Sequence, residues 1–140
     1  MRTFLRVGTV VATAALTFGA MAGVSSADTY DKGCGDGWND PGGRDCWAEW
    51  RNSSGVQVSW AGFTAYDEIL YAVDAEADGR GVYIKATWSG GSAEIKHTQG
   101  ADAGRLEKDL DIAEGASVSL TMCQTNNGAL VNCAYATAIA

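Results

Sequence analysis

The chain has 140 residues, a formal net charge of −7 at pH 7 and a hydrophobic fraction of 46%. Its excess of acidic residues argues against binding to nucleic acid or to an anionic membrane, because both partners require a basic surface. A chain of this length has room for a short targeting segment followed by one domain with a single core.

Residues 1–27 have the pattern of a secretory signal peptide. Arg2 and Arg6 give a positive start, residues 7–24 are apolar but too short to span a bilayer with margin, and residues 25–27 are small. We therefore expect a secreted, extracellular protein without a membrane anchor that begins at Asp28. Because the leader contains two of the ten basic residues and no acidic one, eight basic and seventeen acidic residues remain, a charge of −9.

Residues 28–45 form the second predicted region. They are rich in Gly, Asp and Asn with isolated aromatic residues, a composition that favours turns and makes a regular element costly in backbone entropy. We predict a loose, extended N-terminal segment that leads into an ordered glycine-rich loop pinned by Cys34 and Cys46. The rest of the chain, residues 46–140, is predicted to be the folded domain.

Short runs with two-residue periodicity follow from Cys46 onward. They are enriched in β-branched and aromatic residues and are separated by turns that contain Gly or Asn. The predicted strands cover residues 47–51, 56–65 with a bulge at Gly62, 69–73, 82–88, the surroundings of Ile95, 106–112, 118–122 and 131–135. Seven to eight short strands at this spacing predict an all-β domain, an antiparallel β-sandwich of immunoglobulin-like or small-barrel type.

Four cysteines in a small exported chain predict two disulfides. Sequence proximity favours the pairs Cys34–Cys46 and Cys123–Cys133, although three pairings are formally possible. For the second pair, a hairpin with an odd-length loop centred on Gly128 would place the two cysteines opposite each other. A zinc site is disfavoured because no pair has CxxC spacing and the single histidine is distant in sequence. No cofactor is expected.

An acidic segment invites comparison with a calcium loop. Asp74, Glu76 and Asp78 alternate before Gly79, as oxygen ligands do at the opening of such a loop. Lys85 stands where the closing bidentate glutamate would be expected. A solvated acidic turn and a weak calcium site are therefore both open interpretations.

The sequence contains no local signature of catalysis. His97 is the only histidine, and it lies in a polar run without a nucleophile motif beside it. We therefore expect a protein that is not an enzyme, with no catalytic residue and with His97 as a surface or partly buried structural residue.

Five tryptophans are the remaining unusual feature of the composition. Trp60 and Trp88 fall on apolar strand faces and are predicted to fill the core. Trp47 and Trp50 lie on opposite faces of one predicted strand, so one of them should be at the surface. Trp38 lies in the glycine-rich loop, where both burial and exposure to a partner or a sugar ring fit its surroundings.

Several segments resemble small exported β-sandwich proteins of filamentous actinobacteria. These segments are residues 65–68 (AYDE), 70–74 (LYAVD), 77–82 (ADGRGV) and 118–123 (VSLTMC), with Cys133 and Ala136. Some members of this group resemble the small adaptor subunit of antibacterial umbrella-shaped toxin particles, which joins a repeat-built scaffold to lectin-bearing spokes through an extended N-terminal segment. The matching positions are mainly strands and turns, so the resemblance implies the fold more strongly than the function.

The same resemblance implies that the N-terminal segment contacts the partner. The corresponding residues are Asp28, Thr29, Tyr30, Asp31, Lys32 and Trp38. A free extended end can dock in a groove through main-chain hydrogen bonds, with Tyr30 or Trp38 as anchors. The alternative is a frayed terminus without a function.

The leading hypothesis is a secreted, non-enzymatic interaction protein, an adaptor or accessory subunit of an extracellular antibacterial toxin complex. Its partners would be other secreted proteins, namely scaffold and lectin-bearing subunits, and neither nucleic acid nor a membrane. One alternative is a carbohydrate-binding module, because tryptophans and the amides of Asn39 and Asn52 lie in or near loops. Another is a small inhibitor of an exported hydrolase, with the loop between Cys34 and Cys46 as its rigid insert.

Overall fold

The computed structural model describes residues 28–140, so the predicted leader lies outside the described residues. Within this range the regular structure consists of strands and two short 3₁₀ turns. The elements in chain order are β1 (Thr29–Asp36), β2 (Arg44–Arg51), β3 (Gln57–Thr64), η1 (Tyr66–Glu68), β4 (Ile69–Asp74), β5 (Arg80–Trp88), β6 (Gly91–His97), η2 (Ala101–Ala103), β7 (Arg105–Asp109), β8 (Ser117–Asn126) and β9 (Ala129–Ile139). Neither turn has the length or apolar character that a bilayer-crossing helix needs.

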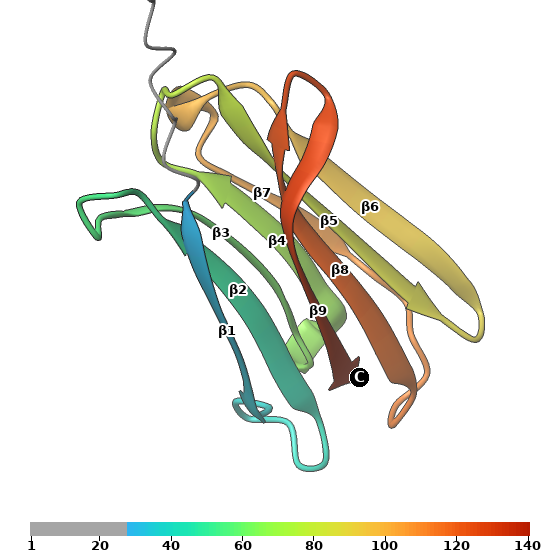
Figure 1. Ribbon diagram of the computed structural model, residues 1–140. Coiled ribbons are helices and arrows are strands. Elements are labelled where there is room, and N and C mark those ends of the chain that lie inside the picture. Colours follow the sequence, from blue (N-terminus) through green and yellow to red (C-terminus); the bar gives the residue numbers. More distant parts are fainter. Residues whose placement is uncertain (1–27) are drawn as a thin grey trace, which may run out of the picture.

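The strands form two antiparallel layers that are joined along one side (Figure 1). One layer has the order β6-β5-β8-β9 and the other the order β1-β2-β3-β4-β7. A single pairing, Arg44 opposite Ile139, connects β2 to β9. The result is a β-sandwich that is nearly closed into a barrel, which confirms the predicted fold class.

β1 is the strand that the sequence analysis missed. It pairs with β2 over its full length, so the prediction that this segment is loose was wrong. The disulfide Cys34–Cys46 lies within this ladder, and eight main-chain pairings outweigh the entropic cost of the glycines. Gly33 serves close packing, because a Cβ at this position would lie 2.5 Å from the ring of Trp47 on the paired strand.

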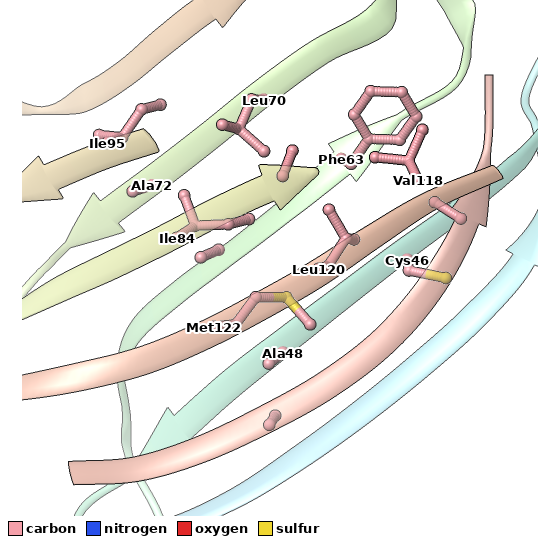
Figure 2. Packing of buried hydrophobic residues seen from close by; sticks show 14 of the residues in the cluster. Cys46, Ala48, Phe63, Leu70, Ala72, Ile84, Ile95, Val118, Leu120 and Met122 are labelled. Atoms are coloured by element: carbon pink, nitrogen blue, oxygen red, sulfur yellow. The ribbon is translucent and has the colours of Figure 1, made fainter. Parts of the chain in front are cut away.

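The core lies between the two layers and consists of alternate residues of the facing strands (Figure 2). β5 and β8 direct inward the residues that the two-residue periodicity predicts, namely Val82, Ile84, Ala86, Val118, Leu120 and Met122. Phe63 and Leu70 face them from the other layer and are fully buried. Full burial of a large apolar side chain contributes about 1.5–3 kcal/mol, so this core holds the two layers together.

The disulfide Cys123–Cys133 is confirmed, but the β8–β9 hairpin brings the two cysteines together through a different geometry from the predicted one. Its loop has two residues, Asn127 and Gly128, both with positive φ, as a tight hairpin turn requires. A bulge in the register between Met122 and Gln124 then adds one residue to β9. The bulge, rather than an odd-length loop, brings Cys123 opposite Cys133.

The predicted bulge at Gly62 is wrong, since the irregularity in this region lies between Trp50 and Arg51. Gly62 pairs regularly with Trp47, and a Cβ on Gly62 would lie 2.5 Å from the hydroxyl of Tyr71. The glycine is therefore required by a side chain that lies over it.

The tryptophans divide differently from the prediction. Trp50 is fully buried and Trp47 is 40% exposed, which confirms that one of this pair lies at the surface. Trp88 is partly buried and packs against the core, as predicted, whereas Trp60 is partly buried outside it, so the prediction that Trp60 fills the core was wrong. The residues of β3 that face inward are Ser59, Ala61 and Phe63, and Trp60 points to the outer face of its layer.

Candidate functional site

The N-terminal residues that were expected to contact a partner are held in the sheet. Residues 29–32 belong to β1 and are solvent-exposed. The carboxylate of Asp28 accepts a hydrogen bond from Gln124 Nε2 at 2.8 Å and forms an ion pair with Arg80 at 2.8 Å. The free docking peptide expected from the sequence is therefore corrected to a fixed strand with one open edge.

Trp38 lies in the loop between β1 and β2, and its side chain is exposed. With 75% of its surface exposed, it is the most accessible large hydrophobic residue of residues 28–140. Its ring lies edge-on to the ring of Tyr66 in η1, with centroids 6.0 Å apart and planes at 80°. This edge-to-face arrangement is favourable, and Tyr66 is itself 43% exposed. The two rings form an exposed aromatic pair.

The loop that carries Trp38 is fixed by its own backbone and by its neighbours. The N–H of Gly37 donates to the carbonyl of Gly43 at 2.8 Å, and a Cβ on Gly43 would lie 2.6 Å from Cβ of Ala65. The carboxylate of Asp45 accepts the N–H of Ala65 at 2.7 Å, which ties the end of the loop to the start of η1. An exposed indole on such a backbone has little freedom to lose on binding, as an interface anchor requires.

Two adjoining grooves extend from this loop to the line where β1 faces β9. The first has a volume of about 500 Å³ and is lined by the loop, the end of β1 and Ile139. The second has a volume of about 380 Å³. Its lining residues are Lys32, Gly33, Cys34, Arg44, Tyr135, Ala136 and Thr137. Cys34 and Arg44 line both grooves, so the two form one continuous depression beside the aromatic loop.

The outer face of the five-stranded layer carries a second aromatic group. Cross-strand register places Trp47, Trp60 and Tyr71 on this face. The guanidinium of Arg105 covers the ring of Tyr71 at 4.1 Å from the centroid. Burial raises the pKa of the Tyr71 phenol, and the positive charge of Arg105 opposes this rise. Trp47 is therefore the accessible ring of this group.

His97 is fully buried, so the predicted surface or partly buried position was wrong. It belongs to a buried polar cluster with Ser59 and Asp74, each at most 3% exposed. Its Nε2 lies 2.6 Å from the carbonyl oxygen of Gly104 and donates a hydrogen bond to it, because a carbonyl oxygen can only accept. Within residues 28–140, His97 Nδ1, Ser59 Oγ and Asp74 Oδ2 are buried without a hydrogen-bond partner. At this depth the three groups are closed to a dissolved substrate.

The acidic segment after β4 does not assemble as a calcium loop would. Asp74 points into the core, where Oδ1 accepts the N–H of Glu76 at 3.4 Å. Asp78 is exposed and accepts the N–H of Arg80 at 2.8 Å. Throughout residues 28–140, no group of three or more His, Cys, Asp or Glu side chains is arranged to hold a metal ion.

Asp74→Asn is expected to stabilise the fold at neutral pH. Burial raises the pKa of Asp74 above its ordinary value of 3.8, although the N–H of Glu76 and the charge of His97 oppose the rise and Asp78 and Glu76 add to it. At a pH below 3.8, Asp74 is protonated in both the folded and the unfolded protein, and its burial costs no charge. As the pH rises through the raised pKa of the folded state, the buried carboxyl ionises and the fold loses stability. Asparagine has nearly the same shape and stays neutral at both pH values.

Urea denaturation of both proteins at pH 7 and at about pH 3.5 tests this. We expect Asp74→Asn to raise the urea midpoint at pH 7 and to lose most of this advantage at the lower pH, where the aspartate is also neutral. A difference that is the same at both values would contradict a buried, unpaired carboxylate.

No protein family, curated protein or solved structure matches this chain.

Several residues of the site escaped the sequence analysis. Tyr66 lies in one of the segments that carry the family resemblance, but nothing local marks it as a neighbour of Trp38. Arg44 and Tyr135 meet at the groove although they are distant in the chain. A usable signal existed for Arg44: an antiparallel register centred on the Cys34–Cys46 disulfide places this residue opposite Asp36 at the end of the ladder.

Proposed function

We propose that this protein is a secreted, non-enzymatic interaction protein that acts as an adaptor or accessory subunit of an extracellular complex. The kind of complex is the antibacterial toxin assembly that the sequence resemblance implies. The partners are other secreted proteins. Two disulfides suit an oxidising compartment outside the cytoplasm.

The observation that carries this proposal is the exposed Trp38–Tyr66 pair on a fixed loop. A tryptophan that is 75% exposed leaves a large apolar surface in water, and a rigid backbone presents it in one orientation. Tryptophan and tyrosine are the residues most enriched at the energetic centres of protein interfaces. The adjoining groove supplies the concave surface beside this anchor.

Trp38→Ala is expected to abolish capture of the partner. Residues 28–140 are immobilised and incubated with culture fluid of the producing organism, and the retained proteins are identified and quantified. We expect one partner in stoichiometric amount with the wild-type protein and a loss of more than about tenfold in affinity with Trp38→Ala, since a central tryptophan contributes about 2 kcal/mol or more.

Leu130→Ala is the matched control. Leu130 is 47% exposed and lies at the β8–β9 hairpin, at the opposite end of the sandwich from the Trp38 loop (Figure 1). Its truncation removes apolar surface of the same kind and should leave capture unchanged. A wild-type protein that elutes as a monomer and retains no stoichiometric partner would sink the adaptor proposal.

Binding of a polysaccharide is the second candidate function, and Trp47 favours it. The ring of Trp47 is exposed on the sheet and lies over Gly33, where three ring atoms would be within 3.0 Å of an added Cβ. An indole laid on a sheet in this way offers its other face for stacking on a sugar ring. Adsorption to insoluble cellulose or chitin should then be lost in Trp47→Ala and kept in Trp38→Ala. Absence of wild-type adsorption to any insoluble glycan would remove this candidate.

A further inference from the structure

We propose that the groove between β1 and β9 binds an extended, acidic peptide segment of a partner protein and holds one of its carboxylates between Lys32 and Arg44. The inference rests on the proposed function and names the chemistry of the partner. It stands on three features of the groove: an open strand edge, a local positive charge and an acidic boundary.

On the edge of β9 that faces the groove, the main-chain N–H groups of Tyr135 and Thr137 pair with no strand of residues 28–140. β9 pairs with β8 along one side, whereas on the other side its pairing within residues 28–140 is limited to Ile139 opposite Arg44. The carbonyl of Tyr135 accepts a hydrogen bond from Lys32 Nζ at 2.7 Å across the groove, so Tyr135 directs its main-chain groups toward β1. Thr137, two residues further along, has the same orientation in an antiparallel strand.

The disulfide Cys34–Cys46 lies at the bottom of the groove, next to β9. The sulfur of Cys46 lies 3.4 Å from the carbonyl oxygen of Thr137, and Cys34 lines the groove beside it. An extended peptide that lies along β9 therefore meets the main-chain N–H groups of Tyr135 and Thr137 at its side and the disulfide beneath it. Strand addition to an exposed edge is a common mode of peptide recognition, in which main-chain hydrogen bonds give the affinity.

The charge of the groove is opposite to that of the protein. Lys32 and Arg44 are the charged residues that line it, in a chain with a net charge of −7. The ion pairs formed within residues 28–140 involve neither of them. An ammonium and a guanidinium without a carboxylate partner form a ready site for an acidic side chain or a C-terminal carboxylate.

The adjoining groove limits how far the acidic part of the peptide extends. Asp36 and Asp40 line it, and Asp36 lies opposite Arg44 in the register of β1 with β2. Their negative charges repel a carboxylate placed beyond Arg44. The peptide therefore carries its acidic residue near Lys32 and an uncharged or basic residue toward the loop of Trp38. The exposed ring of Tyr135 at the rim offers an apolar contact along the way.

The test uses residues 28–140 and two fluorescein-labelled octapeptides, one of alternating valine and glutamate and one of alternating valine and lysine. We expect saturable anisotropy with the glutamate peptide, weaker binding as salt is raised, and little binding of the lysine peptide. The double variant Lys32→Glu with Arg44→Glu should weaken binding at least tenfold, whereas Lys32→Arg with Arg44→Lys should retain it. Lys85→Glu, an exposed lysine of β5, is the matched charge control and should behave as the wild type apart from a small salt-dependent change.

Amide hydrogen exchange distinguishes docking along β9 from non-specific attraction by surface charge, which would not protect particular amides. The glutamate peptide should slow exchange of the β9 amides at Tyr135 and Thr137, and circular dichroism verifies that each variant is folded. Equal binding of both peptides, full binding by the charge-reversed variant, or unchanged exchange in β9 would each overturn the inference. Partner capture through Trp38 without peptide binding would sink this inference alone, and peptide binding without a captured partner would sink the adaptor role alone.

Discussion

Removal of the Cys34–Cys46 disulfide is expected to lower the free energy of unfolding by about 3 kcal/mol, as the loss of a cross-link over a short loop does, and to abolish partner capture. The two cysteines are 12 positions apart and close the base of the loop that carries Trp38. The double variant Cys34→Ala with Cys46→Ala leaves no free thiol. Without the cross-link, β1 and β2 separate more readily at this end, and the indole loses its fixed orientation. Urea denaturation measures the first effect, and capture from culture fluid measures the second.

The second disulfide provides the matched control. Cys123 and Cys133 are 10 positions apart, so the chain-entropy argument gives nearly the same loss of stability. This cross-link lies in the β8–β9 hairpin, far from Trp38, and its removal should leave capture intact at temperatures where the domain is folded (Figure 1). If both double variants lose capture equally, stability rather than the geometry of the Trp38 loop controls the interaction.

The two-residue periodicity was sufficient to predict the fold class and the inward faces of β5 and β8. It succeeded there because both strands lie in the middle of their layer and bury one complete face, as Ile84 and Leu120 illustrate. It failed for β1, where composition indicates turns but pairing with β2 and a cross-link decide the conformation. A register centred on Cys34 and Cys46 is information that the sequence contains and that local propensity does not use.

The candidate site is predictable only where it is local. Trp38 stands out in the sequence because a large ring in a glycine-rich loop is unusual, but its position depends on the close approach of Gly43 to Ala65 and on the contact of its ring with Tyr66. The groove depends on the closure of two layers, which brings Lys32 to Tyr135 across 103 positions of the chain. Neither periodicity nor a local motif predicts a contact between residues so far apart in the chain, so the groove is visible only in the three-dimensional structure.

Trp50→Ala is expected to lower the free energy of unfolding by about 3–5 kcal/mol, the range for truncation of a buried tryptophan. Trp50 is fully buried, and its Nε1 donates to the carbonyl of Asn132 at 2.9 Å. Asn132 lies at the bulge of β9 and donates Nδ2–H to Gln124 at 3.0 Å. Trp50 thus connects β2 to the bulge across the side where the two layers have a single main-chain pairing. Trp50→Phe keeps most of the volume and should cost about 1–3 kcal/mol, because it leaves this partly buried carbonyl without its donor.

Trp60→Ala tests whether Trp60 lies on the outer face of its layer, as in the structure, or in the core, as the sequence pattern predicts. The periodicity of β3 places Trp60 with Val58 on an apolar face, whereas the register pairs Trp60 with Glu49 and Val73 on the outer face of the layer. A half-buried ring on that face leaves no closed cavity when it is truncated, so Trp60→Ala should cost clearly less than Trp50→Ala in urea denaturation. Equal losses in the two variants would mean that β3 directs the opposite face inward. The placement of Ser59 beside Asp74 in the core would then be wrong as well, because both depend on the same register.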